Sequence, residues 1–174
     1  MMLRSFVLLM CSCSMILWTL ELFAAETYKQ VRGKNDDWHI IVPSDWTVEN
    51  SKSSPVLFTS PDGLSVCGVH WALLKEKKRR YSHAELKKWA NELVASQSWL
   101  KAKVVRKTSL ILPSGENGVR YEVSIPLAPG GRSLRLYTAS NGKLFTVDCE
   151  TFASLWENRK ATYFAVIGGF DFSH

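Results

Sequence analysis

The sequence predicts an α+β domain in which helices pack on the faces of an antiparallel β-sheet, as in an αβα sandwich. Short segments rich in β-branched and aromatic residues, separated by turn residues, occupy most of the 174-residue chain. One long amphipathic helix interrupts these segments, and helical and apolar patterns return near the C-terminus. Strands that follow one another through hairpins, without a regular alternation of strand and helix, are typical of antiparallel sheets.

The N-terminus has the composition of a secretory signal peptide. Arg4 gives a short positive start, residues 6–20 form an uncharged and mostly apolar run, and Ala24 and Ala25 follow. This order is typical of an export signal, and the run is too short to span a hydrocarbon core of about 30 Å comfortably. We therefore expect a signal peptide over residues 1–25 and a single domain over residues 26–174.

The cleavage site leaves two alternatives open. Leu22 or Phe23 stands three residues before the cut, where a small residue is preferred. The segment can therefore remain in place as a membrane anchor, and Ser12-Cys13 resembles the end of a lipoprotein signal. In each case we expect an exported domain, periplasmic or secreted, that is either released or membrane-tethered.

Five strands are predicted before the long helix. Their segments are rich in residues that favour strands, and they end at turn residues such as Pro43 and Pro61-Asp62-Gly63. The predicted strands cover residues 28–31, 38–42, 44–48, 56–59 and 64–74.

The helix that follows has the clearest local signature in the chain. Ser82 and Glu85 form the S-x-x-E pattern of a capping box, which satisfies backbone N–H groups at a helix start. An apolar stripe at helical spacing comes next, made of Leu86, Trp89, Ala90 and Leu93, with Gln97 closing the row. We expect this helix to lie on the sheet, and a helix on a membrane surface is the alternative.

The second half of the chain contains a hairpin whose register can be predicted. Strands are expected over residues 104–112 and 119–125, and then over 133–139 and 143–150 around Asn141-Gly142. Both turn residues tolerate positive φ, which favours a two-residue type I′ turn. Counting residues outward from this turn along both strands pairs Arg135 with Asp148. The face expected to be buried contains Leu134, Leu136, Thr138, Phe145, Val147 and Cys149.

The C-terminal segment combines helical and apolar patterns. Residues 152–163 are compatible with one or two short helices, and an apolar stretch over 164–167 ends at Gly168-Gly169. Residues 170–172 are expected to form a last extended piece.

Two cysteines remain after the predicted signal peptide, and both are expected to face inward. Cys149 lies on the buried face of the hairpin, and Cys67 shares a strand face with Val69 and Trp71. An even number of cysteines in an oxidising compartment permits a disulfide. A Cys67–Cys149 disulfide and two buried free thiols both remain open.

Two short segments and the order of elements resemble the PsbP-like superfamily. Residues 41–46 (IVPSDW) and 58–63 (FTSPDG) come first, followed by the helix, the Asn141-Gly142 hairpin and the closing helical segment. The superfamily includes the extrinsic subunit of photosystem II and a Ran-binding nuclear import factor. The resemblance implies an αβα sandwich over the whole domain and a binding or assembly role, without shared catalytic residues.

The charge of the chain favours an anionic partner. The formal net charge is +6, and basic residues surround the long helix. The candidate partner-binding residues are Lys75, Lys77, Lys78, Arg79, Arg80, Lys87 and Lys88, with Lys101, Lys103, Arg106 and Lys107 further along. A protein or an anionic envelope component is the expected partner, and the export signal argues against nucleic acid. A solvated lysine-rich surface is the alternative, and Trp38, Trp46, Trp99 and Trp156 could line a groove.

The sequence contains no catalytic or metal-binding pattern. HExxH, CxxC, GxSxG and GxxxxGK patterns are absent, and no histidine has a partner at metal-ligand spacing. We therefore predict no metal, no cofactor and no enzyme activity. The predicted function is an exported binding or assembly protein of the cell envelope, and the alternatives are a lipid or small-ligand carrier and a small secreted hydrolase.

Overall fold

The computed structural model describes residues 27–33, 36–49, 55–77, 80–127 and 129–173. The predicted signal peptide, Lys78, Arg79 and His174 lie outside the described residues. The larger sheet is antiparallel throughout and contains, in spatial order, β3 (Thr47–Glu49), β4 (Val56–Thr59), β5 (Ser65–Leu73), β9 (Lys143–Phe152), β8 (Gly131–Ser140), β7 (Asn117–Ile125) and β6 (Lys103–Ile111). The smaller sheet contains β1 (Tyr28–Arg32), β2 (Trp38–Pro43) and β10 (Asp171–Phe172).

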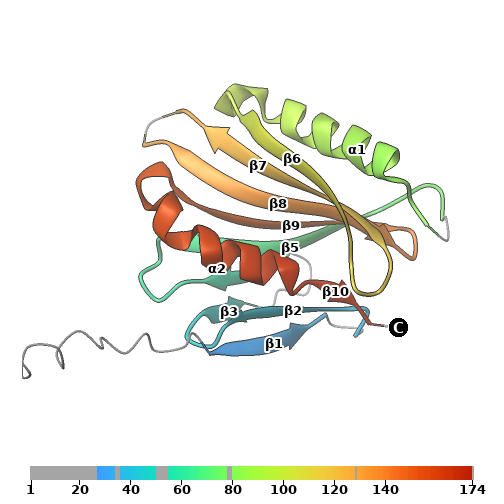
Figure 1. The fold of residues 1–174 in the computed structure, drawn as a ribbon, viewed down its shortest axis with the longest axis horizontal. Helices are drawn as coiled ribbons and strands as arrows, with labels where there is room; N and C mark the ends of the chain where they lie inside the picture. Colours follow the sequence, from blue (N-terminus) through green and yellow to red (C-terminus); the bar gives the residue numbers. More distant parts are fainter. Residues whose placement is uncertain (1–26, 34–35, 50–54, 78–79, 128, 174) are drawn as a thin grey trace, which may run out of the picture.

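Two α-helices cover opposite faces of the larger sheet. Helix α1 (His83–Ser96) packs on β6, β7 and β8, and the turn η1 (Ser98–Leu100) follows it. Helix α2 (Trp156–Gly168), which follows the turn η2 (Ala153–Leu155), packs between the other face and β2. Figure 1 shows the resulting layers, with α1 on one side of the sheet and α2 with the smaller sheet on the other. The predicted αβα sandwich is therefore present, and the second sheet is a feature that the sequence did not predict.

The hairpin of β8 and β9 has the predicted register. Ser140 pairs with Lys143 and Arg135 pairs with Asp148. The turn residues have positive φ, 50° at Asn141 and 74° at Gly142, as a type I′ turn requires.

Helix α1 begins with the predicted capping box. The Ser82 side chain accepts from the backbone N–H of Glu85, and the Glu85 carboxylate accepts from that of Ser82. Its buried residues are Leu86, Ala90 and Val94, at spacings of four. The prediction that Leu93 faces the core was wrong, because its side chain is 39% exposed. A step of one residue turns a helix by about 100°, which places Leu93 on a flank.

The largest core lies on the α2 side and contains three of the six described tryptophans. Trp38, Trp46 and Trp156 are only 2–3% exposed, so the hypothesis that they line a groove was wrong. The C-terminus of α2 approaches β2 so closely that a Cβ atom on Gly169 would lie 1.9 Å from Ile41 Cγ1. Trp71 was expected inside but is 43% exposed.

Cys67 and Cys149 are directly paired residues of β5 and β9. Their Cα atoms lie 4.0 Å apart and their sulfur atoms form a disulfide, so the structure contains the bonded alternative. Both residues are fully buried in the α2-side core. In the described part of the chain, no helix has the length and apolar character needed to cross a membrane.

Candidate functional site

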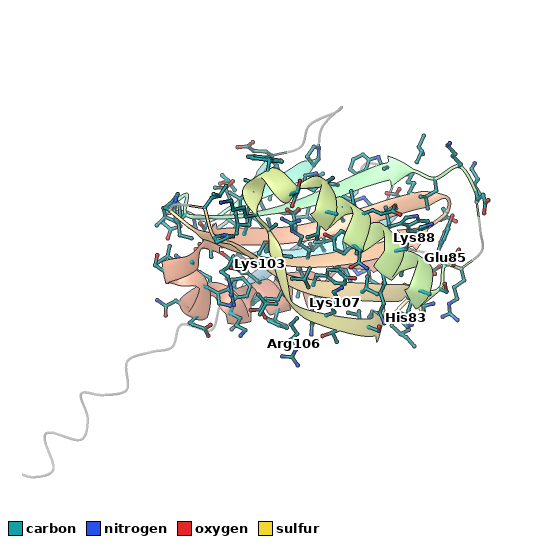
Figure 2. The ribbon with its side chains drawn as sticks, turned by 90° about the horizontal axis from the view of Figure 1, so that it is seen from above. His83, Glu85, Lys88, Lys103, Arg106 and Lys107 are labelled. Carbon is teal, nitrogen blue, oxygen red and sulfur yellow. A yellow bond between two sulfur atoms is a disulfide. The ribbon has the colours of Figure 1, made fainter. Side chains whose placement is uncertain are left out.

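Helix α1 covers only one half of its sheet face. It packs on β6, β7 and β8, whereas β5 and β9 lie beside it without a covering helix among the described residues. Figure 2, viewed from the α1 side, shows this division along the length of the helix. The helix therefore separates two surfaces, one along β6 and one over β5 and β9.

The surface along β6 is basic. Strand β6 has the sequence KVVRKTSLI, with three basic residues and no acidic residue. Lys103, Arg106 and Lys107 are exposed on it, as is Lys87 on the neighbouring flank of α1. Figure 2 shows the three β6 residues spaced along the strand. We call these four residues, Lys87, Lys103, Arg106 and Lys107, the basic strip.

Contacts to α1 fix one end of the basic strip. Lys107 Nζ donates to Asn91 Oδ1 at 2.9 Å and lies 5.1 Å from the centre of the Tyr121 ring. The Tyr121 hydroxyl also donates to Asn91 Oδ1, at 3.0 Å, and contacts the Lys87 carbonyl at 3.4 Å. The strip is thus held by a cation–π contact and by helix groups that carry no charge.

Nearby charges do little to neutralise the basic strip. Glu122, which is paired with Arg106 in the sheet, forms a 2.6 Å ion pair with Arg132 and is buried. Burial and the neighbouring Arg106 guanidinium both lower the pKa of Arg120. This shift indicates that positive charges repel one another across β6 and β7.

The basic residues predicted from the sequence do not form one cluster. Lys75 and Lys88 line a hollow of about 460 Å³ with Trp89, on the flank of α1 opposite Lys87. The Arg80 guanidinium donates to the Gly115 carbonyl in the β6–β7 turn. Lys77 is exposed before the undescribed Lys78 and Arg79. The sequence placed Lys103, Arg106 and Lys107 near the helix. In the structure Lys107 lies on the α1 face of β6 with Lys87, whereas Lys103 and Arg106 point to the opposite face of this edge strand.

The uncovered surface over β5 and β9 contains a histidine–carboxylate pair. His70 Nε2 lies 3.1 Å from Asp148 Oδ1, although the residue directly opposite Asp148 is Gly68. A Cβ atom on Gly68 would lie 2.8 Å from His70 Nε2, so the glycine makes room for the ring. The hydrogen bond to Asp148 raises the pKa of His70 above its usual range. Sequence spacing could not reveal this diagonal contact.

Arg135 and Glu150 extend the charged row of this surface. Arg135 is buried, with Nη1 donating to Gln97 Oε1 at 2.7 Å and Nε donating to Ser133 Oγ at 3.0 Å. The pKa of Glu150 is raised, because neighbouring groups desolvate its carboxyl and because Asp148 is also negative. Glu150 is nevertheless exposed at the surface, so its carboxyl stays accessible.

Glu150 also borders an apolar pocket of about 390 Å³ that opens to solvent. Apolar side chains from five segments line the pocket: Leu64, Val66, Leu100, Ile125, Leu127, Pro129 and Phe152. Carriers of small apolar ligands bind them in pockets of this size and lining.

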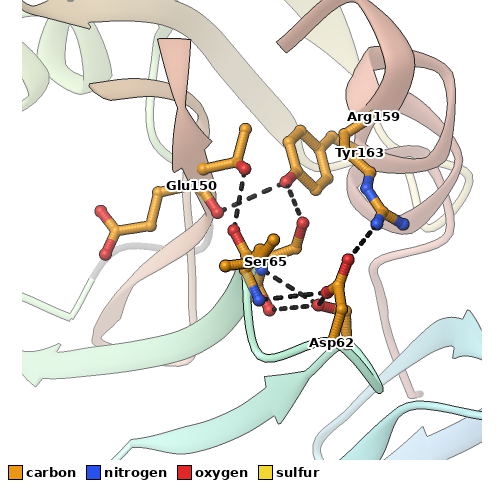
Figure 3. Close-up of polar contacts among 8 residues, drawn as sticks. Asp62, Ser65, Glu150, Arg159 and Tyr163 are labelled. Atoms are coloured by element: carbon orange, nitrogen blue, oxygen red, sulfur yellow. Dashed lines mark hydrogen bonds and ion pairs between the residues drawn. The ribbon is translucent and has the colours of Figure 1, made fainter. Parts of the chain in front are cut away.

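A polar network fixes the β5 end of this pocket to α2 (Figure 3). The Tyr163 hydroxyl donates to Ser65 Oγ at 2.7 Å and lies 3.4 Å from the Glu150 carbonyl. In the adjoining turn, Ser60 Oγ donates to Asp62 Oδ1 at 2.5 Å, and Arg159 of α2 forms an ion pair with Asp62. The buried hydroxyls of Ser60, Ser65 and Tyr163 therefore have a structural role, because their hydrogen bonds hold these segments together.

Metal-binding geometry is absent from the described residues. No group of three or more histidine, cysteine, aspartate or glutamate residues there could hold a metal ion. His83 Nε2 lies 2.9 Å from the Leu110 carbonyl, which ties α1 to β6. The chemistry available is therefore charge complementarity along β6, and proton binding and apolar contact over β5 and β9.

Solved structures of known proteins share this architecture. Cyanobacterial PsbP (CyanoP) from Synechocystis superposes with a TM-score of 0.66 at 15% identity, covering 91% of this chain and 99% of that chain. The Ran-binding protein Mog1p of Saccharomyces cerevisiae gives 0.58 at 11% identity, covering 84% and 96%. LpqN of Mycobacterium tuberculosis, which is involved in cell envelope biogenesis, gives 0.52 at 8% identity, covering 85% and 91%. No protein-family model and no curated protein matches the sequence.

The chain has the PsbP-like fold. The resemblance seen in the sequence is confirmed at the level of fold, and the structure shows what its two segments do. Residues 41–46 end β2 and bring Trp46 into the α2-side core, while residues 58–63 place Phe58 in the same core and form the following turn. Both segments of the PsbP-like fold are therefore structural, and function must be argued from the surfaces.

Proposed function

We propose that this protein is an exported, non-enzymatic binding or assembly protein of the cell envelope that docks an acidic protein partner on its basic strip. The concentration of Lys103, Arg106 and Lys107 on the edge strand β6, with Lys87 on the neighbouring flank of α1, carries this proposal. Three exposed cations on a strand without an acidic residue, with Lys87 on the neighbouring helix, create a positive potential that favours association with a negative surface. The N-terminal sequence and the cell-envelope role of LpqN support the proposed compartment.

Matched charge variants test the docking surface. Lys103→Gln/Arg106→Gln and Lys75→Gln/Lys77→Gln each remove two positive charges, but only the first pair lies on the basic strip. At about 0.2–1 kcal/mol for each exposed ion pair, the first variant should bind an immobilised glutamate-rich protein about 2- to 30-fold more weakly. The second variant should bind within about 2-fold of the wild type. Equal weakening by both variants would show that net charge alone causes the binding.

A small-ligand carrier is the second candidate function, and the pocket beside Glu150 favours it. Its apolar lining suits an apolar ligand, and Glu150 and Arg132 in the lining can contact a polar group of that ligand. Native mass spectrometry of protein purified from its own host should then show an added mass, which Val66→Trp should abolish by filling the pocket. A bare protein mass for the wild type would argue against this function.

The hydrolase alternative remains a prediction that depends on the His70–Asp148 pair. A histidine paired with a carboxylate can act as a base, but hydrolysis by a covalent route also needs a nucleophile beside it. A panel of ester and peptide substrates, compared between wild type and His70→Ala, tests this alternative. Turnover that His70→Ala removes would contradict the non-enzymatic proposal.

A further inference from the structure

Strand β6 offers an open edge of the larger sheet. Its neighbour is β7, and no second strand pairs with it among the described residues. The N–H of Leu112 donates to the carbonyl of Glu116 at 2.8 Å, which fixes the register of the hairpin. Backbone groups alternate in direction along an antiparallel strand, so those of Leu110 and Thr108 point toward β7. Those of Lys107, Ser109 and Ile111 point outward and can pair with an added strand.

The side chains of this edge vary along its length. Arg106 and Lys107 place positive charge on both faces of the sheet at one end, and Ile111, 65% exposed, lies at the other. The register is regular from Arg106 to Ile111, and a bulge between Val104 and Arg106 ends it. The edge thus has room for a strand of about six residues, a usual strand length.

The charges of β6 restrict which strand can pair with it. Natural sheet edges use lysine and other charges to prevent pairing with identical edges. Two β6 strands brought together antiparallel would each present Arg106 and Lys107 without any acidic residue to compensate. The same charges favour an acidic strand, because opposite charges on neighbouring strands attract.

We propose that an acidic, extended segment of the protein partner adds to the larger sheet as a new strand beside β6. This inference rests on the proposed function and specifies how the acidic partner binds. Acidic side chains of the segment lie beside Arg106 and Lys107, an apolar side chain lies near Ile111, and backbone hydrogen bonds form to Lys107, Ser109 and Ile111. Strand addition combines main-chain hydrogen bonds with side-chain selectivity.

Amide hydrogen exchange gives a position-specific test. The probe is a synthetic eight-residue peptide with a valine-rich N-terminal half and a glutamate-rich C-terminal half, which antiparallel pairing places beside Ile111 and beside Arg106 and Lys107, added to the ¹⁵N-labelled full domain. We expect slower exchange at the amides of Lys107, Ser109 and Ile111 in the complex, and little change at Thr108 and Leu110, which already face β7. If the peptide binds and the exchange rates of all these amides stay unchanged, strand addition beside β6 is overturned.

A methylated peptide separates strand pairing from charge attraction. N-methylation of alternate residues blocks one hydrogen-bonding edge of the peptide and retains its charge, so methylation in the pairing register should weaken binding at least about 10-fold. Methylation of the other set should have little effect. If both methylated peptides bind equally well and Lys103→Gln/Arg106→Gln weakens the binding of each, strand addition is refuted. The proposed function would stand in that case. Failure of the unmethylated peptide to bind would refute strand addition for acidic segments and leave the test with a folded acidic protein to decide the proposed function.

A variant of the protein provides the reciprocal test. Ser109→Pro removes an outward N–H without changing charge and without removing a bond to β7, and proline is tolerated at such edge positions. It should weaken peptide binding about 3- to 10-fold relative to the matched control Ser109→Ala. Unchanged binding by Ser109→Pro, or a concentration-dependent dimer of the wild type through β6, would overturn the assignment of this edge to an acidic partner.

Discussion

The disulfide between Cys67 and Cys149 should account for a large part of the stability of the domain. The bond joins residues separated by 82 positions, so it restricts about half of the unfolded chain. The loop-entropy relation for a closed loop of this length gives about 4.5 kcal/mol at room temperature. The free energy of unfolding of a typical domain is about 5–15 kcal/mol, so loss of the bond should remove about 30% or more of it.

Urea denaturation with and without a reductant measures this contribution. With a urea dependence of about 2 kcal/mol per molar, loss of 4.5 kcal/mol moves the unfolding midpoint down by about 2 M. Cys67→Ala/Cys149→Ala should show a similar decrease and then no further response to the reductant. Two titratable thiols in the oxidised, unfolded wild type would refute the reasoning, as would a midpoint that the reductant leaves unchanged.

Two further predictions concern the pH dependence and the core. The pKa of folded His70 is raised above its unfolded value of 6.5, so the stabilisation from its pairing with Asp148 is complete below pH 6.5 and is lost as the pH rises through the folded pKa. His70→Ala should reduce this loss in urea titrations above pH 6.5, and an unaltered slope would contradict the pairing. Leu86→Ala should lower the free energy of unfolding by about 2–5 kcal/mol, because the Leu86 side chain of α1 is fully buried. The matched control Leu93→Ala should cost less than about 1 kcal/mol, and similar costs for both leucines in thermal or urea unfolding would show that the orientation of α1 is wrong.

Features set by neighbouring residues were predictable from the sequence. The capping box of α1 needs only Ser82 and Glu85, and the β8–β9 register needs only the conformation of Asn141-Gly142. Both depend on backbone groups within a few residues, where competing arrangements are few. The order of strands and helices along the chain follows from such local patterns.

Features that depend on distant segments were not predictable in the same way. Strand β10 has only two residues and joins β2 from the other end of the chain, so no local pattern indicates the smaller sheet. Hydrophobicity identified Trp38 and Trp46 as large apolar residues but could not show that β2 and α2 enclose them. The His70–Asp148 pair needs both the pairing of β5 with β9 and the missing side chain of Gly68.

The basic residues show the same limit at the surface. Composition indicated a positive face around the helix, but the residues nearest in sequence are distributed over its two flanks. Lys87 and Lys88 are adjacent in the chain, yet a turn of about 100° between neighbours directs them to different surfaces. The basic strip arises only when β6 packs beside α1, which brings Lys107 to Asn91 across 16 positions.

The position of α1 has a functional consequence. The basic strip and the surface with His70 and Glu150 lie on opposite flanks of the helix, so a strand added to β6 leaves the pocket beside Glu150 open. An acidic partner at β6 therefore need not displace a ligand from that pocket. The two sites differ in chemistry, because the basic strip favours an acidic segment whereas the pocket beside Glu150 and Arg132 binds mainly by apolar contact. A PsbP-like domain with one helix on this face can thus present two independent surfaces on the same sheet.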